Sequence, residues 1–224
     1  MSFESRLKSY TPVLRPALRC TKEQVLDQVR DCMHGIGHGL GNIAGLDIDQ
    51  NTTSGKQYRL MSARLCRIAD VLFDYAIEGV WPDAKRVGKT EHLEDIIADF
   101  SFMSGVARIS TELYNTENPL HLEKVLGMAL VRTQLYANVE GLELDYATLP
   151  TDRTPLTLQH VAILAQMTEK AVRNATQPKA KDRLETIKVG AKTMVTHEEA
   201  LRWLSNRRNF KPTVIPDSVR PQTH

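Results

Sequence analysis

Apolar residues recur at helical spacing along almost the whole of this 224-residue chain, and this feature restricts the fold more than any other. Apolar positions three and four residues apart place an apolar stripe on one face of a helix, which packs into a core. No alternating run predicts a pair of strands. The expected helices cover residues 22–36, 56–79, 90–113, 119–136, 154–175, 178–190 and 197–208. The sequence therefore predicts an all-α fold, an antiparallel helical bundle followed by a small basic C-terminal helical unit and an extended tail.

Local signals predict where several helices begin and end. Thr21–Gln24 and Thr196–Glu199 each match a capping box, in which the side chains of the first and fourth residues bond each other's backbone N–H groups. Thr154 before Pro155 predicts a further helix start. Six glycines between Gly35 and Gly55 predict that the first helix ends there and that a long loop follows.

Charge is distributed unevenly along the chain. Residues 1–22 carry a net charge of +4, residues 23–148 carry −8 and residues 149–224 carry +6. An acidic body suits divalent cations, and a basic end suits phosphates. The expected domains are a helical bundle with an acidic middle over residues 1–177 and a basic helical unit with its tail over residues 178–224.

Composition excludes several classes of protein. With 42% apolar and 25% charged residues, the chain has the make-up of a globular protein. No apolar run reaches the roughly 20 residues that a membrane-spanning helix needs. The N-terminus does not resemble a secretion signal, and the three cysteines are scattered. We expect a cytoplasmic protein with reduced thiols and no membrane partner.

Carboxylates form two rows at intervals of four residues, on two helices that the sequence predicts to be neighbours. The rows are Asp70, Asp74 and Glu78, and Glu91, Asp95 and Asp99. On antiparallel helices they would line one acidic groove, and Mg²⁺ prefers such oxygen ligands. Bound Mg²⁺ would assist attack of water on a phosphoanhydride. The alternative is that both rows are solvated surface, paired with nearby arginines.

Two short segments carry a family resemblance. Ser-Ala-Arg-Leu-Cys-Arg-Ile-Ala-Asp at residues 62–70 and Glu-His-Leu-Glu-Asp-Ile-Ile at residues 91–97 lie where the all-α nucleoside triphosphate pyrophosphohydrolases, the MazG-like group, have E-x-x-E and E-x-x-D. Residues 169–178 are similar to the Lys-x-x-x-Asn helix with which that group closes over a nucleotide. The resemblance implies Mg²⁺-dependent hydrolysis and a homodimer. It implies a metal site of Asp70, Asp74, Glu91, Asp95 and Asp99, with Lys170 and Asn174 on the nucleotide.

The chain departs from that pattern at three positions. Arg64 and Arg67 replace the first pair of glutamates, and His92 replaces the glutamate of the second motif. Arginines repel Mg²⁺ and attract phosphate. Two possibilities stay open: a metal site rebuilt from the remaining carboxylates, or an inactive scaffold that binds a nucleotide or a protein.

The basic C-terminal region suggests a different class of function, a non-enzymatic adaptor or regulator. A helix ending near Gly190, a turn and a capped helix loosely resemble a helix-turn-helix, with Trp203 docking the unit on the body. Such a unit would hold nucleic acid, without sequence preference, or an acidic protein partner. The candidate nucleic-acid contacts are Lys179, Lys181, Arg202, Arg207, Arg208 and Lys211.

His34 and His38 are four residues apart and would share a helix face, as metal ligands do. Two histidines alone do not complete a metal site, so we expect a structural role. No nucleophile motif is present, the sequence assigns no catalytic residue, and it leaves open whether the chain is an enzyme.

Overall fold

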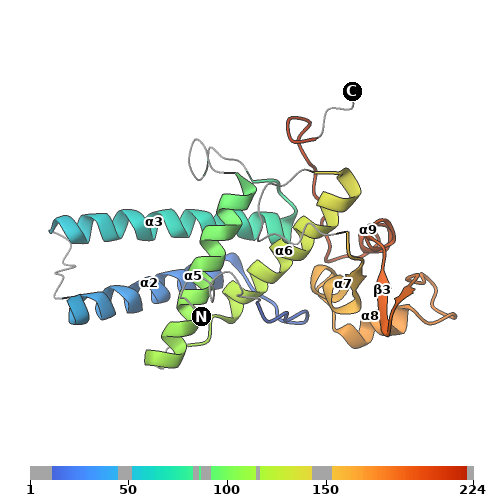
Figure 1. The fold of residues 1–224 in the computed structure, drawn as a ribbon, viewed down its shortest axis with the longest axis horizontal. Coiled ribbons are helices and arrows are strands. Elements are labelled where there is room, and N and C mark those ends of the chain that lie inside the picture. The colour runs from blue at the N-terminus through green and yellow to red at the C-terminus, as the bar shows by residue number, and fades with distance from the viewer. Residues whose placement is uncertain are drawn as a thin grey trace. The chain divides into compact units, whose positions relative to one another are not determined.

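The computed structural model describes residues 12–44, 52–82, 86, 92–114, 117–142 and 153–220. Within these ranges the chain forms seven α-helices, one π-helical turn and one small three-stranded sheet (Figure 1). The all-α prediction is therefore confirmed. None of the helices in these ranges combines the length and the apolar character that crossing a bilayer requires.

The described residues belong to two compact units. Unit 1 contains Cys20–Phe73 and Pro82–Glu123, and unit 2 contains Pro12–Arg19, Asp74–Trp81 and the chain from Lys124 onward. The domain boundary that the sequence predicts, after residue 177, falls inside unit 2.

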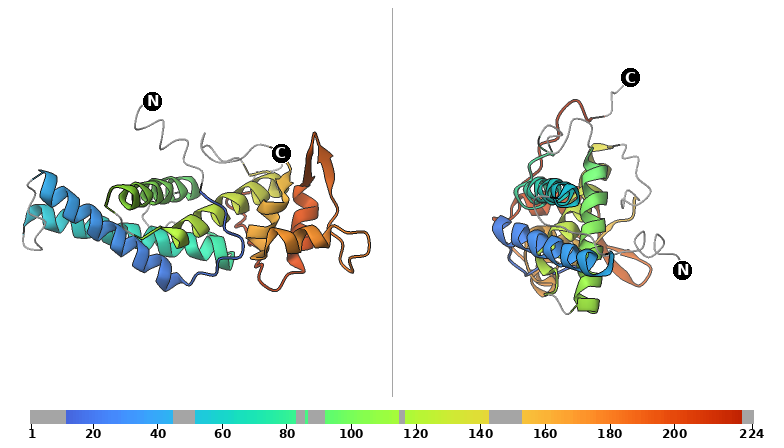
Figure 2. Two further views of the ribbon diagram at one scale, coloured as in Figure 1. Left: turned by 90° about the horizontal axis from the view of Figure 1, so that it is seen from below. Right: turned by 90° about the vertical axis from the view of Figure 1, so that its left-hand side faces the viewer.

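Unit 1 is built on two long helices that lie side by side in opposite directions, α2 (Lys22–Ala44) and α3 (Thr53–Phe73) (Figures 1 and 2). A third helix, α5 (Leu93–Tyr114), packs against both. Their apolar stripes meet in a core that includes Val25, Val29, Met33, Ile68, Leu72, Ile96, Phe100 and Met103. Met61 lies at the helical spacing of the apolar stripe of α3, so its periodicity predicts burial, but it is 45% exposed.

The first capping box is confirmed, but the predicted end of its helix is wrong. The backbone N–H of Gln24 donates to Thr21 Oγ1 at 3.2 Å, and the N–H of Thr21 donates to Gln24 Oε1 at 2.9 Å. Helix α2 then continues through Gly35 and Gly37 to Ala44. Each glycine costs a helix up to about 1 kcal/mol relative to alanine. Packing of α2 along α3 offsets this cost, because tertiary contacts override propensity.

Unit 2 includes the π-helical turn η1 (Asp74–Glu78) and most of α6 (Leu120–Glu140), whose first residues belong to unit 1. Its C-terminal part, which we call the C-terminal module, covers residues 153–210. The module's elements are β1 (Leu156–Thr157), α7 (Leu158–Ala165), α8 (Glu169–Ala175), β2 (Ile187–Val189), β3 (Lys192–Val195) and α9 (His197–Ser205). The strands pair antiparallel in the order β1-β3-β2.

Two predicted helices in this region are wrong. Residues 154–175 form a short strand and two helices rather than one helix, with Thr157 instead of Thr154 as the first cap. Residues 178–190 contain no helix and end in β2, so the sheet was missed. Strands of two to four residues are too short to show alternation, and pairing with β3 rather than a local pattern fixes them as strands.

A buried arginine in α6 fixes the chain after α9. The Arg132 side chain donates from Nη1 to Lys211 O at 2.8 Å and to Thr213 Oγ1 at 2.7 Å, and from Nε to Ala76 O at 3.2 Å. Its guanidinium also lies 5.0 Å from the centre of the Phe210 ring. The predicted extended tail thus begins as a segment held against α6.

Candidate nucleic-acid interface

The C-terminal module displays one short helix, α8, on its surface. Helix α7 is buried along most of its length, from Val161 through Ala165. In contrast, Val172 is the buried residue of α8. The side chains of Lys170, Arg173 and Asn174 are exposed. The helix is therefore anchored by its inner face and presents cations and an amide to solvent.

A turn of three residues joins α7 to α8. Gln166 ends α7 in the left-handed conformation (φ 51°), and Met167 N donates to Ala162 O at 3.0 Å. Thr168 then caps α8, since its hydroxyl accepts the N–H of Ala171 at 3.2 Å. Two helices joined by such a short, well-bonded turn have the connection of a helix-turn-helix motif.

A β-hairpin follows α8 in the same module. Strands β2 and β3 are joined by the two residues Gly190 and Ala191, and Gly190 has a positive φ of 58°. A positive φ at the first central position alone is typical of a type II′ hairpin turn. Lys188 and Lys192 are exposed on the two strands, and Lys188 Nζ donates to Thr193 Oγ1 at 2.8 Å.

The stretch of the chain from α8 through the hairpin is basic. Residues 169–192 contain seven basic and three acidic side chains. All seven basic residues are exposed: Lys170, Arg173, Lys179, Lys181, Arg183, Lys188 and Lys192. A high density of exposed lysine and arginine in one stretch of a domain is an electrostatic feature that favours binding of nucleic-acid phosphates.

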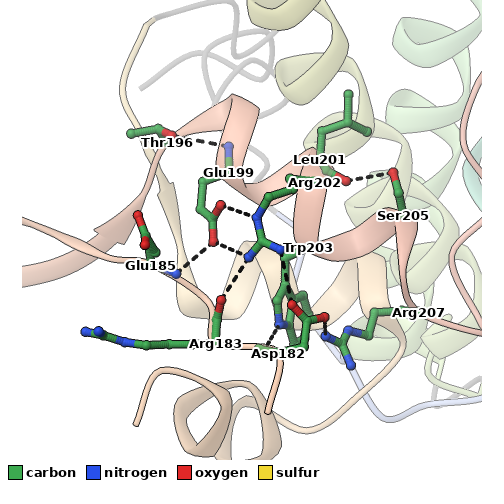
Figure 3. Close-up of polar contacts among 10 residues, drawn as sticks. All are labelled: Asp182, Arg183, Glu185, Thr196, Glu199, Leu201, Arg202, Trp203, Ser205 and Arg207. Carbon is green, nitrogen blue, oxygen red and sulfur yellow. Dashed lines mark hydrogen bonds and ion pairs between the residues drawn. The ribbon is translucent and has the colours of Figure 1, made fainter. Parts of the chain in front are cut away.

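A network of ion pairs ties the segment before β2 to α9 (Figure 3). The Arg202 guanidinium donates to both carboxylate oxygens of Glu199, at 2.6 and 2.7 Å, and to Asp182 Oδ1 at 3.1 Å. Arg207 bonds the other oxygen of Asp182. The hydrogen bonds to Glu199 and Asp182 raise the pKa of Arg202, and the hydrogen bond from Arg202 lowers the pKa of Glu199. Each partner therefore favours the charged form of the other.

The second capping box is confirmed for one of its two bonds. Thr196 Oγ1 accepts the N–H of Glu199 at 3.3 Å and so caps α9. The Glu199 carboxylate does not complete the box in the usual way: it accepts the backbone N–H of Glu185 at 2.8 Å. A residue that the sequence assigned to a local cap therefore holds a distant part of the chain.

The six predicted nucleic-acid contacts separate into two groups. Lys179, Lys181 and Arg208 are exposed, and no ion pair involves them among the described residues. Arg202, Arg207 and Lys211 are already in ion pairs, Lys211 with Glu78.

The predicted helix-turn-helix at the C-terminus is wrong. β2, not a helix, lies before Gly190, and the two helices joined by a short turn are α7 and α8. Lys170 and Asn174, predicted to contact a nucleotide, lie on the second helix of this pair.

The predicted magnesium ligands of unit 1 have protein partners of their own. Asp70 pairs with Lys22 at 2.8 Å and Arg86 at 2.5 Å, and Asp99 pairs with Arg64 at 2.6 Å. Burial alone would raise the pKa of Asp70, but its two cations outweigh burial and lower that pKa.

Of the other predicted ligands, Asp95 and Asp74 lie among the described residues and Glu91 does not. Asp95 Oδ2 accepts the N–H of His92 at 3.1 Å at the start of α5. Asp74 belongs to unit 2, and Glu91 lies outside the described residues. No group of three histidine, cysteine, aspartate or glutamate side chains able to hold a metal occurs in the described ranges. The magnesium site stays a prediction.

Unit 1 also contains a cavity of about 430 Å³ between α2, α5 and the turn before α6. Its lining residues are Gln28, Asp31, Cys32, Gly35, Ala107, Ser110, Glu117 and Pro119. None of the predicted site residues lines this cavity. His34 is exposed nearby on α2, and the side chain of His38 lies outside the described residues.

Comparison with known proteins gives no relative: no family model, no curated protein and no solved structure matches this chain. Function must therefore be argued from the site. The sequence did not predict α8 as a separate helix, nor the β2–β3 hairpin. Two signals pointed to them: Thr168 as a helix cap, and the β-branched pair Ile187 and Val189 directly before Gly190.

Proposed function

We propose that this protein binds duplex DNA through α8 and the β2–β3 hairpin. The observation that carries the proposal is the exposed face of α8: Lys170, Arg173 and Asn174 on a helix held to α7 by a three-residue turn. A single helix fits into the major groove of DNA, and the second helix of a helix-turn-helix is the one that enters it.

The exposed side chains supply both kinds of contact that DNA recognition uses. Lysines on α8, on the segment after it and on the hairpin can meet phosphates, which gives affinity without sequence information. Asn174 can bond the two adjacent groups of an adenine edge. Arg173 already pairs with Glu169 at 2.6 Å, one turn earlier on the same helix. We therefore assign base contacts to Lys170 and Asn174, and phosphate contacts to the remaining lysines.

The test is fluorescence anisotropy of a labelled duplex with the full chain over a series of salt concentrations. The logarithm of affinity should fall linearly with the logarithm of salt concentration. Lys188→Ala and Lys192→Ala should each weaken binding and reduce the salt slope by about 1, and Lys170→Ala, at a proposed base contact, should weaken binding by about 1–3 kcal/mol. Lys56→Ala, which removes an exposed lysine of α3 in unit 1, is the matched control and should leave binding unchanged. If all four variants bound the duplex as tightly as the wild-type chain does, the proposal would be overturned.

Sequence preference is tested separately by selection from a random duplex library. A preference enriched by the wild-type chain should be relaxed at one adenine by Asn174→Ala, at a cost of about 1–3 kcal/mol for that base pair. Selection of the same sequence by both proteins would show that Asn174 does not read a base.

Magnesium-dependent nucleotide hydrolysis is the second function that the sequence predicts. We favour DNA binding because Asp70 and Asp99 are paired with cations, whereas Lys170, Lys179 and Lys181 are exposed.

A further inference from the structure

We propose that Asp182 and Glu199 are positioning residues for DNA binding, which act through Arg202 and set the place of the hairpin relative to α8. This inference rests on the proposed DNA-binding function. Both side chains are negatively charged and would repel phosphates. They can therefore favour DNA binding only by positioning other groups that contact the DNA. Their role follows from the segment they hold, residues 182–185, which links the end of α8 to β2.

One side of this segment is fixed to α8. Leu184 is fully buried, and its backbone N–H donates to Ala175 O, the last residue of α8, at 2.9 Å. Arg183 Nε donates to Thr176 O, one residue further along, at 3.4 Å. These contacts hold Arg183 and Leu184 against the C-terminal end of α8.

The other side of the segment is fixed to α9 by three bonds to its backbone. Trp203 Nε1 donates to Asp182 O at 3.1 Å, and Arg202 Nη2 donates to Arg183 O at 2.8 Å. The N–H of Glu185 donates to Glu199 Oε1 at 2.8 Å. Three residues before β2 are therefore placed by α9 (Figure 3).

Arg202 joins these bonds into one unit. Its planar guanidinium reaches Glu199, Asp182 and the backbone of Arg183 together, which a lysine ammonium cannot do in one geometry. Arg207 bonds Asp182 as well, and its guanidinium carbon lies 4.0 Å from the centre of the Trp203 ring. The network therefore depends on the shape of the arginine as well as on its charge.

Strand β2 is held by this network and by its pairing with β3. All three of its residues are exposed, and it is an edge strand that pairs with β3 alone in the sheet order. The Arg202 side chain is 47% exposed, so its ion pairs add little to global stability. The consequence of the network is the placement of β2, with Lys188 on it, relative to α8.

The decisive experiment uses Asp182→Ala and Glu199→Gln in the salt-dependent anisotropy assay with the same duplex. Each substitution removes a negative charge, so electrostatics alone predicts tighter binding. We expect the opposite, a loss of roughly 5–10-fold, with a salt slope lowered toward that of the Lys188→Ala/Lys192→Ala double variant. Glu198→Gln makes the same charge change at the adjacent exposed position and should not weaken binding.

A conservative variant and a double-mutant cycle complete the test. Arg202→Lys keeps the positive charge but loses the planar guanidinium with its several donors, and it should weaken binding as Asp182→Ala does. If Arg202 instead contacted a phosphate directly, lysine would be tolerated. In the Lys188→Ala/Lys192→Ala background, Asp182→Ala should cause no further loss. Hydrogen exchange should be faster at Glu185 and in β2 and unchanged in α7, which separates displacement of the hairpin from unfolding of the module.

Each outcome has a defined meaning. If Lys170→Ala weakens binding while Asp182→Ala, Glu199→Gln and Arg202→Lys do not, the positioning role is wrong and the DNA-binding proposal stands. The positioning role is also wrong if Asp182→Ala causes a full additional loss in the double-lysine background. If the wild-type chain does not bind the duplex at low salt, the proposed function fails, and the inference fails with it.

Discussion

Gly79 is the residue whose identity the packing restricts most directly. Its φ is +71°, and a Cβ added there would lie 2.5 Å from Lys211 O and 2.8 Å from Pro212 O. Gly79→Ala should therefore destabilise the protein by at least about 2 kcal/mol, because it combines backbone strain with a clash against backbone atoms. Denaturant unfolding measures this loss.

Gly35→Ala is the control for that prediction. Gly35 lies inside α2, and an added Cβ would meet nothing within 4 Å. The substitution should stabilise the protein by up to about 1 kcal/mol, the difference in helix propensity. A loss of stability at Gly35 equal to that at Gly79 would contradict the structural explanation.

Cys32 should be an unreactive thiol at neutral pH. Burial raises its pKa to about 11. The thiolate is the reactive form, so alkylation of the folded protein at pH 8 should be slow and should accelerate as the pH approaches 11. Mass spectrometry after a timed iodoacetamide pulse measures the rate. In denaturant, where an ordinary thiol pKa of about 8.5 returns, Cys32 should react at pH 8. Fast labelling in the native protein at pH 8 would show that the thiol is not buried.

At the scale of elements, the segment Phe210–Ile215 depends on Arg132. Burial lowers the pKa of this arginine. The free-energy cost of burying its charge is offset by three hydrogen bonds and by the Phe210 ring. Arg132→Ala removes these bonds and leaves Lys211 O without this donor. We expect a loss of about 2–4 kcal/mol and faster hydrogen exchange in residues 211–215.

A control variant tests whether this effect belongs to the segment. Arg208→Ala removes an exposed arginine close to it in the chain and should change neither stability nor exchange. Unchanged protection of residues 211–215 in Arg132→Ala would mean that other contacts hold the segment, such as the N–H of Thr213 on the Tyr136 hydroxyl at 2.6 Å.

Elements differ in how far the sequence predicts them. The stripe of α5, from Leu93 to Ala107, is buried as its periodicity predicts. The sequence did not predict the division between α7 and α8, because the left-handed conformation of Gln166 is not encoded by a glycine. Nor did it predict β2, whose three residues acquire strand geometry by pairing with β3.

At the scale of the whole molecule, the magnesium hypothesis and the DNA proposal predict different results for the same sample. We expect no Mg²⁺-dependent release of pyrophosphate from any nucleoside triphosphate, because Asp70 and Asp99 are paired with cations. We also expect millimolar Mg²⁺ to leave the thermal unfolding temperature unchanged, since a ligand that binds the native state would raise it.

The reverse result is equally well defined. Pyrophosphate release that requires Mg²⁺ and disappears in Asp95→Asn would establish the metal site and refute our preference.

The predicted homodimer bears on the DNA proposal as well, because helix-turn-helix dimers bind two half-sites one helical turn apart. Sedimentation of the full chain with and without duplex DNA tests it.

The sequence by itself determined the helical class, the caps at Thr21 and Thr196, and the basic character of the C-terminal region, because each depends on residues within one or two helical turns. The tertiary structure decided which charged side chains form ion pairs within the protein and which stay exposed to solvent. Asp182 and Arg202 are 20 positions apart, and Arg64 and Asp99 are 35 apart. No local pattern encodes such pairings. Contacts between distant residues place Arg202 and Arg207 in ion pairs with Asp182. Lys170 and Asn174 stay exposed on α8.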